Sequence, residues 1–346
     1  RTAISLGKIT INGSAVDPDR ILRNGDLIEH ATHRHEPPVS ATPVVVVSDA
    51  DDLVVVDKPS SLPVHPTGRY HHNTLLHVLR SEEYGFKDLY PVNRLDRLTS
   101  GITLIARTKK KSQEMMVELS ERRVQKSYLC RVRGEFPEGK IQCDEPILTV
   151  NYKLGVNMVS PNGKPCSTLF QRRSYNGLTS VVQCWPKTGR THQIRVHLQY
   201  LGHPIANDPI YCSDVWGPEQ GKGGVAEDLT TRMMEDFERH AFPHEEEESQ
   251  PAPDAERQDQ TPTPTTSDAS DRVPNCLDCA RRRADPIPEQ LEIWLHSWKY
   301  EGEGWSFETP EPAFAGDGFE GDRVLPERFW RFGGKWDGVA AGVVVE

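Results

Sequence analysis

One aspartate in this sequence stands between two arginines. Within the run Pro91–Gly101, Asp96 lies between Arg94 and Arg97 and precedes a Thr-Ser-Gly turn. This pattern predicts a loop just ahead of a strand. Neighbouring guanidinium groups favour the ionised carboxylate and lower its pKa, which suits a nucleophile or a base. Taken alone, an Arg-x-Asp-Arg run is more typical of a surface turn with ordinary local ion pairs.

A second run, Trp185–Leu198, predicts the end of a strand followed by a helix over 191–201. Thr191 and Arg195 are four positions apart, which places them on one helix face. Arg195 could then point toward the sheet and reach a carboxylate on another loop. Arg190, near the helix N-terminus, is a candidate phosphate contact. The alternative is an amphipathic surface helix with solvated arginines.

A third run, Lys126–Gly134, reads as a strand with Tyr128 on one face together with Lys126. A tyrosine that faces a pocket can stack on a nucleobase, whereas a core tyrosine would only need its hydroxyl satisfied. The surrounding stretch 107–133 has nine basic and three acidic residues. It is a candidate phosphate-binding surface, and the alternative is a solvated helix face.

The chain has 346 residues and a net charge of −10, and this charge is divided unevenly. Residues 1–217, which carry the three runs, have a net charge of +6, while 218–273 have −10 and 274–346 have −6. An overall acidic chain is therefore compatible with an RNA partner, because local charge steers phosphates.

Several classes of protein are disfavoured by composition. The aliphatic runs are too short to span a bilayer, and Arg1–Gly7 lacks the apolar core of a signal peptide. Seven scattered cysteines suit a reducing compartment better than a disulfide scaffold. We expect an intracellular protein, with cytoplasm, nucleus and mitochondrion all open. Since the sequence does not begin with Met, we expect it to be part of a longer chain.

The pattern of elements predicts an α+β fold with a central mixed, mostly antiparallel sheet flanked by helices, plus a small N-terminal appendage. Expected helices cover about 74–80 (with Asn73 as N-cap), 111–123, 191–201 and 288–296; expected strands include 44–47, 53–56, 101–106, 126–133, 152–159, 166–173, 178–185, 298–300 and 304–307. The expected domains are 1–38 as part of an alpha-L-type RNA-binding module, 43–216 as the catalytic domain, 217–273 as a disordered acidic insertion, 274–315 as the C-terminal part of the catalytic domain, and 316–346 as a tail.

Two metal hypotheses are open. A metal-dependent hydrolase would draw on histidines that lack a recognised ligand spacing with carboxylates: His71, His72, His192, His197 and His203. Separately, Cys276 and Cys279 form one C-x-x-C pair. A structural zinc site needs four ligands, so Cys212 and a histidine would have to complete it; otherwise the pair is structural.

The three runs together resemble the three sequence motifs of RluA-type pseudouridine synthases, in the same order and with similar spacing. Further similarities are Lys58-Pro59, Val64–Pro66 and Gly202–Asp208, and Leu295–Tyr300 resembles the C-terminal element of the eukaryotic tRNA-modifying branch. The resemblance covers about 43–212 and 286–312. It implies the pseudouridine synthase fold and isomerisation of uridine in RNA. One departure is Asn93, where the family often has histidine.

The resemblance also implies site residues. It makes Asp96 the catalytic nucleophile, Tyr128 the base-stacking residue and Arg195 the ion-pair partner of Asp96. Substrate-binding candidates are Arg94, Arg97, Lys126, Arg190, Thr191 and His192. No cofactor and no metal are expected, and the partner is RNA bound by a monomer.

The resemblance favours tRNA as the substrate, at position 32 of the anticodon loop, with ribosomal RNA as the second candidate. A catalytically silent RNA-binding protein is the alternative. A synthase that acts on either RNA requires the carboxylate of Asp96 and the guanidinium of Arg195 to meet at the floor of one cleft. A catalytically silent protein does not require this contact.

Overall fold

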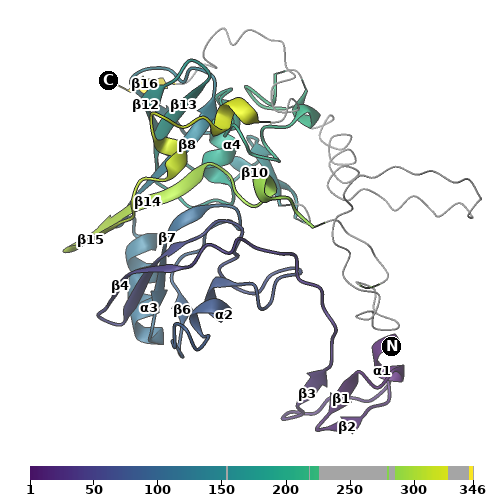
Figure 1. Ribbon diagram of the computed structural model, residues 1–346. Helices are drawn as coiled ribbons and strands as arrows, with labels where there is room; N and C mark the ends of the chain where they lie inside the picture. The colour runs from purple at the N-terminus through teal and green to yellow at the C-terminus, as the bar shows by residue number, and fades with distance from the viewer. Residues whose placement is uncertain (153–154, 218, 226–278, 280–284, 326–342, 346) are drawn as a thin grey trace, which may run out of the picture. The chain divides into compact units, whose positions relative to one another are not determined.

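The computed structural model describes residues 1–152, 155–217, 219–225, 279, 285–325 and 343–345 (Figure 1). The chain divides into two compact units. The first comprises Arg1–Pro37 and Pro253–Asp285, and the second comprises Pro38–Ala252 and Pro286–Glu346. Most of the expected acidic insertion, from residue 226 on, lies outside the described residues, as does most of the expected tail. No helix among the described residues has the length and apolar character needed to cross a membrane.

The first unit contains a short helix, α1 (Thr2–Ser5), and a three-stranded antiparallel sheet in the order β2-β1-β3. Its strands are β1 (Ile9–Ile11), β2 (Ser14–Ala15) and β3 (Ile28–His30). Asn12 and Gly13 both have positive φ, which is the turn expected of an Asn-Gly pair. Of the side chains that the structure describes in Arg1–Pro37, only Ile11 is buried. The described part of Arg1–Pro37 therefore has very little apolar core.

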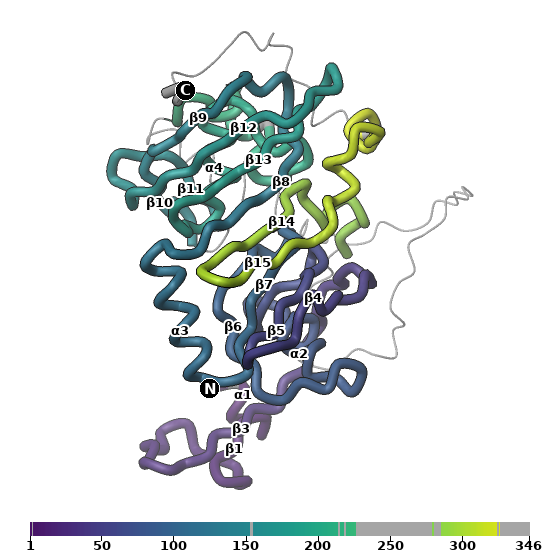
Figure 2. Tube along the Cα trace, turned by 90° about the vertical axis from the view of Figure 1, so that its left-hand side faces the viewer, coloured from purple at the N-terminus to yellow at the C-terminus, as the bar shows by residue number. Residues whose placement is uncertain are grey.

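The second unit is built on one large sheet, whose strands succeed one another from β9 to β4 in Figure 2. The strand order is β16-β9-β12-β13-β8-β14-β7-β5-β4, with β15 on β14 and β6 on β7. Only the contact of β14 with β7 is parallel among these described pairs. The expected α+β class with a mixed, mostly antiparallel sheet is thus confirmed. The strands are β4 (Val45–Ala50), β5 (Leu53–Lys58), β6 (Tyr90–Pro91), β7 (Ser100–Ala106), β8 (Gln125–Arg133), β9 (Lys140–Cys143), β12 (Thr168–Tyr175), β13 (Thr179–Pro186), β14 (Leu295–Gly302), β15 (Trp305–Glu308) and β16 (Val343–Val345).

Smaller elements flank this sheet. A two-stranded sheet pairs β10 (Ile147–Asn151) with β11 (Val156–Val159), and the α-helices are α2 (Leu75–Leu79), α3 (Lys109–Ser120) and α4 (Gln193–Tyr200). Short 3-10 helices are η1 (Asp214–Trp216), η3 (Pro288–Gln290), η4 (Ala313–Ala315) and η5 (Gly321–Val324). The cap of α2 is Thr74, not Asn73 as expected. The cap of α3 is Thr108, whose hydroxyl accepts a hydrogen bond from the backbone N–H of Lys111.

The helix expected over 288–296 is wrong. The segment makes one 3-10 turn, η3, and then enters β14 at Leu295. Ile293, Trp294 and Leu295 are all buried, because β14 lies between β8 and β7 with neighbours on both sides. A short apolar run that is buried on every side does not reveal by its period whether it is helix or strand.

Strand β5 shows how the core forms on both sides of the sheet. Val54 and Val56 pack with α2 in one cluster, while Leu53 and Val55 belong to the main cluster that includes Met115 of α3. Successive side chains of a strand point to opposite faces, so the continuous aliphatic run at 53–56 is explained by burial on both faces.

Two arginines of the basic stretch are structural and do not track phosphate. Arg131 is buried, and its guanidinium donates hydrogen bonds to the carbonyl of Phe314 at 2.5 Å and to Thr179 at 2.9 Å. Arg133 is also buried and donates to Gln220 at 3.1 Å. The expectation that the whole stretch 107–133 forms a phosphate-binding surface is therefore wrong for these two residues. A buried cation needs such partners.

Gly101 is required where β7 meets β14. Its φ is +107°, and a Cβ on this residue would run into the backbone of Ser297. We expect Gly101→Ala to lower the free energy of unfolding by on the order of 3 kcal/mol, because strain and overlap add. Gly177→Ala is the matched control. Gly177 also has a positive φ, +91°, but open space at its Cβ, so it should lose only about 1 kcal/mol. Equal losses in urea unfolding would contradict this account.

Candidate active site

The second unit contains a cavity of about 580 Å³ beside the centre of the sheet. This volume falls within the usual range for ligand pockets. Eight of the nine predicted site residues line it: Arg94, Asp96, Lys126, Tyr128, Arg190, Thr191, His192 and Arg195. The ninth, Arg97, is not among the lining residues; its guanidinium lies over the ring of Tyr70, 5.5 Å from the centroid. The three sequence runs therefore converge on one site.

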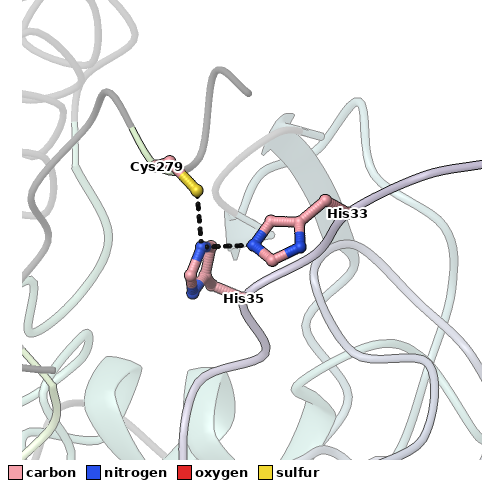
Figure 3. Close-up of side chains that lie close together, drawn as sticks. All are labelled: His33, His35 and Cys279. Carbon is pink, nitrogen blue, oxygen red and sulfur yellow. Dashed lines mark hydrogen bonds between the residues drawn. The ribbon is translucent and has the colours of Figure 1, made fainter. Parts of the chain in front are cut away.

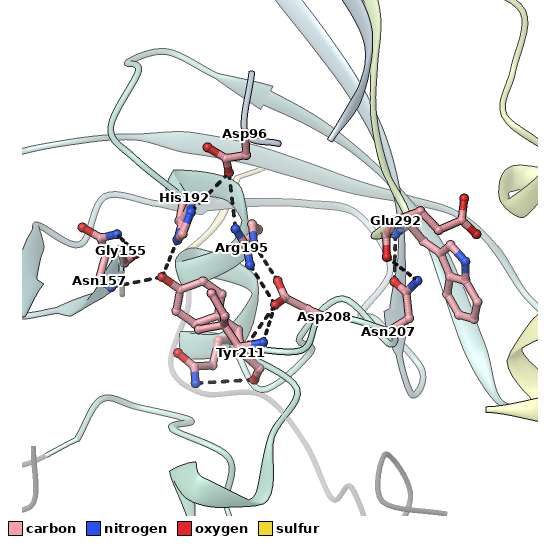
Figure 4. A network of polar contacts seen from close by, with 12 residues as sticks. Asp96, Gly155, Asn157, His192, Arg195, Asn207, Asp208, Tyr211 and Glu292 are labelled. Atoms are coloured by element: carbon pink, nitrogen blue, oxygen red, sulfur yellow. Dashed lines mark hydrogen bonds and ion pairs between the residues drawn. The ribbon is translucent and has the colours of Figure 1, made fainter. Parts of the chain in front are cut away.

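Asp96 and Arg195 meet in this cavity, as the sequence motifs predicted. Nη1 of Arg195 lies 3.4 Å from Oδ2 of Asp96, although the two residues are 99 positions apart. The Arg195 side chain is 3% exposed and that of Asp96 is 28% exposed. The guanidinium is thus part of the cavity floor, while the carboxylate remains open to an incoming group. Figure 4 shows the contact between these two side chains.

A second carboxylate holds Arg195 more closely than Asp96 does. Asp208 is fully buried and accepts from Nε of Arg195 at 2.6 Å and from Nη2 at 2.9 Å. It also accepts from the backbone N–H groups of Ile210 and Tyr211. This two-pronged pairing fixes the plane of the guanidinium, and it leaves Nη1 directed at Asp96 (Figure 4).

The electrostatics favour an ionised Asp96. Burial raises the pKa of this carboxyl. His192 and Arg195 together lower the pKa by more than burial raises it, so the pKa lies below its ordinary value. Burial also lowers the pKa of His192 to about 4. Since that imidazole is neutral at pH 7, the Arg195 guanidinium is the cation that holds Asp96 ionised there. Burial lowers the pKa of Arg195 as well, but Asp208 and Asp96 raise it to a net increase.

The segment ahead of α4 is held in place by side chains. His192 has φ +57°, an uncommon conformation for a residue other than glycine. Its Nε2 lies 3.6 Å from Oδ2 of Asp96 and its Nδ1 lies 2.9 Å from the Tyr211 hydroxyl. Gln193 accepts from the backbone N–H of Arg190 at 3.0 Å.

The expectation that Thr191 and Arg195 share a helix face is wrong. Helix α4 begins at Gln193, so Thr191 precedes the helix.

The cavity has a basic rim. Arg94, Arg190 and Thr191 are exposed, while Lys126 is half-buried and burial lowers its pKa. The guanidinium of Arg190 donates to the carbonyl of Pro165 through Nε and Nη2, at 3.2 and 3.1 Å. Arginine and lysine side chains of this kind can contact phosphate groups.

Tyr128 contributes a ring to the cavity wall, and its hydroxyl is bonded inside the protein. It lies 2.8 Å from the hydroxyl of Tyr300 on β14, which also accepts from Nδ2 of Asn93 at 3.2 Å. Asn93 in turn accepts from the backbone N–H of Leu104 at 2.8 Å. The residue that departs from the family pattern thus ties the loop of Asp96 to the tyrosine pair.

Three residues of the site were not singled out from the sequence: Asp208, Tyr300 and Gln193. Asp208 carried a usable signal, because a buried arginine requires a buried carboxylate and Asp208 ends the matching run Gly202–Asp208. Tyr300 ends another matching run, Leu295–Tyr300, but that match did not indicate a contact with Tyr128, because Tyr300 reaches the site through the placement of β14.

Comparison with known proteins identifies the class. Residues 52–200 match the family model described as RNA pseudouridylate synthase. The human protein named pseudouridylate synthase RPUSD2 is 40% identical, over 92% of this chain and 67% of the human one. The Saccharomyces cerevisiae protein named tRNA pseudouridine(32) synthase, mitochondrial, is 41% identical over 91% and 68%. The solved structure of human RNA Pseudouridylate Synthase Domain Containing 4 is also similar, with 20% sequence identity and a TM-score of 0.49. The matched region includes 78% of this chain and 90% of the human chain.

The chain belongs to the RNA pseudouridylate synthase family. It is an isomerase that converts uridine in RNA to pseudouridine, and the resemblance drawn from its three sequence motifs is confirmed.

The pairing of Asp208 with Arg195 predicts a large effect on stability. We expect Asp208→Asn to lower the free energy of unfolding by about 3–5 kcal/mol, because it leaves a buried guanidinium without its closest anion. Asp49→Asn removes a carboxylate from an exposed pair, Arg107–Asp49 at 2.9 Å, and should cost less than about 1 kcal/mol. Urea unfolding measures both. A loss for Asp208→Asn as small as that of the control would show that Asp208 is not the anchor of Arg195.

Proposed function

We propose that the cavity receives one uridine of an RNA and that Asp96 is the catalytic nucleophile. The observation that carries this proposal is the open carboxylate of Asp96, 3.4 Å from a buried guanidinium, in a cavity of about 580 Å³ with a tyrosine in its wall. Arg195 is its ion-pair partner, and Tyr128 is the surface on which the base stacks.

The reaction needs an ionised carboxylate in a site from which water is excluded. Uridine loses its N1–C1′ bond, the base turns, and C5 joins C1′, while the proton of C5 leaves and N1 gains one. The carboxylate could attack C1′ or C6, or could remove a ribose proton to give a glycal. All three routes use Asp96 in its charged form, and the guanidinium of Arg195 offsets the cost of desolvating that charge.

The uridine must leave its stack to reach Asp96, because the carboxylate lies inside a cavity. Tyr128 offers a ring in place of the lost neighbours. Its hydroxyl is engaged with Tyr300, so the ring is held in one orientation. The exposed arginines at the rim, Arg94 and Arg190, would contact the phosphates on either side of the extruded nucleotide.

The proposed substrate is tRNA, with position 32 of the anticodon loop as the target and a monomer as the active form. Two S. cerevisiae relatives support tRNA by name: the tRNA pseudouridine(32) synthase, and a tRNA pseudouridine(31) synthase that is 31% identical over 85% of this chain. Ribosomal RNA is the second candidate. It is favoured by a 34% identical relative from Salmonella typhi named ribosomal large subunit pseudouridine synthase C, which matches only 59% of this chain.

The role of Asp96 is tested by Asp96→Asn, which keeps the shape of the side chain and removes its charge. We expect no release of tritium from C5-labelled uridine in tRNA, with RNA binding retained. Arg195→Lys should also lose most of the activity, because an ammonium cannot replace a guanidinium that contacts two carboxylates. Asp49→Asn, which alters a remote exposed pair, is the control and should turn over normally. Turnover by Asp96→Asn at the control's rate would refute the assignment.

The target is tested by mapping pseudouridine with carbodiimide-based primer extension on RNA from cells with and without the gene. We expect the stop at tRNA position 32 to disappear without the gene and to return with the wild-type gene, but not with Asp96→Asn. Cytoplasmic and mitochondrial tRNA should be mapped separately, since one relative is named as mitochondrial. A stop that disappears from ribosomal RNA alone would reject tRNA as the substrate.

A further inference from the structure

Three side chains of the first unit converge on one point, far from one another in sequence. Nε2 of His33 lies 2.9 Å from Nε2 of His35, which lies 3.0 Å from Sγ of Cys279. His35 and Cys279 are 244 positions apart. All three side chains are half-buried, and the three atoms lie within 4.8 Å of one another. Figure 3 shows both rings and the sulfur directed at this point.

Hydrogen bonding explains this arrangement poorly. An imidazole nitrogen carries either one hydrogen or one lone pair. Nε2 of His35 therefore cannot form two well-aligned hydrogen bonds, one to the His33 ring and one to the Cys279 sulfur. A cation among the three atoms would use the lone pair of each nitrogen and the charge of a thiolate at once.

The backbone favours the same reading. His33 and His35 are two positions apart, so an extended chain places both side chains on one side. Arg34 between them is exposed, while both histidines are half-buried. The two rings meet edge to face, with an interplanar angle of 76° and centroids 4.6 Å apart.

The part of the first unit that the structure describes in Arg1–Pro37 buries little apolar surface. Ile11 is the one buried side chain described in Arg1–Pro37, whereas Leu6, Ile21, Leu22, Leu27 and Ile28 are exposed. A unit with so small a core usually depends on a disulfide or a metal ion. A metal ion bound by His33, His35 and Cys279 would join two distant parts of the chain within this unit.

We infer that His33, His35 and Cys279 supply three of the four ligands of a structural zinc ion. Imidazole nitrogen and thiolate sulfur are the ligands that zinc prefers in tetrahedral structural sites. Zn–N and Zn–S bonds of about 2.1 and 2.3 Å place neighbouring ligand atoms about 3.3–3.6 Å apart, so binding needs only a small outward shift of the three side chains.

The sequence had pointed to Cys279 through the C-x-x-C pair, but it had suggested Cys212 and an unspecified histidine as further ligands. Cys212 is buried in the second unit, where Arg133 is its charged neighbour, and the histidines beside Cys279 are His33 and His35. Cys276, the other half of the pair, lies outside the described residues. The inference therefore stands on the three described side chains.

The test uses the full chain, stripped of metal and titrated with Co²⁺, which reports tetrahedral sulfur ligation by its absorption. We expect one Co²⁺ per chain, with a thiolate-to-cobalt band that is removed by one equivalent of Zn²⁺. Loss of a residue that merely supports a metal ligand already costs about 10–100-fold in affinity. His35→Gln and Cys279→Ser should therefore each weaken Co²⁺ binding by at least about tenfold.

Matched controls separate this site from other thiols and histidines. His30→Gln alters an exposed histidine of the same segment, and Cys143→Ser alters a buried cysteine of the second unit; both should bind Co²⁺ as the wild type does. Wild-type protein without a sulfur-ligated cobalt spectrum would overturn the inference even if the variants misfold. Wild-type affinity in His35→Gln and Cys279→Ser would overturn it as well.

Discussion

The buried guanidinium of Arg195 is the constraint on which the site depends. A cation in this position requires anions, because desolvation without them would cost several kcal/mol. Asp208 supplies one, through two hydrogen bonds and with its own backbone partners. Asp96 supplies the other, yet stays partly exposed. The two carboxylates therefore have different roles. Asp208 fixes the position of the guanidinium, and the guanidinium keeps Asp96 ionised.

The neighbours of this cation extend its influence through the protein. The Arg195 guanidinium also lies over the ring of Tyr211, 4.9 Å from the centroid, and the hydroxyl of that ring is 2.9 Å from His192. His192 in turn faces Asp96. Contacts from three loops and one helix thus surround the carboxylate of Asp96, and each side chain of this set is held by at least one other.

Much of this site could be predicted from the sequence, because its residues fall in three compact runs with fixed spacing. The strands β7, β8 and β13 were expected at 101–106, 126–133 and 178–185, and the meeting of Asp96 with Arg195 followed from the family motifs. The helix expected over 288–296 was wrong because burial on all sides hides the period of a short apolar run. Arg131 and Arg133 looked like surface cations, since charge alone does not reveal a buried carbonyl or amide partner. Tyr300 and the histidine pair near Cys279 depend on contacts between residues about 170–250 positions apart, which no local pattern records.

The position of β14 has a consequence for how the protein is made. Asp96 lies in the loop before β7, and Tyr128 lies in β8. Strand β14 lies between β7 and β8 in the sheet. Residues 295–302 are synthesised long after both, behind a stretch of more than a hundred residues. A nascent chain still on the ribosome can therefore contain Asp96, Tyr128 and Arg195 before β14 has been made to pair with β7 and β8. A chain released before β14 is made would leave the β14-facing edges of β7 and β8 unpaired, and unpaired strand edges promote aggregation.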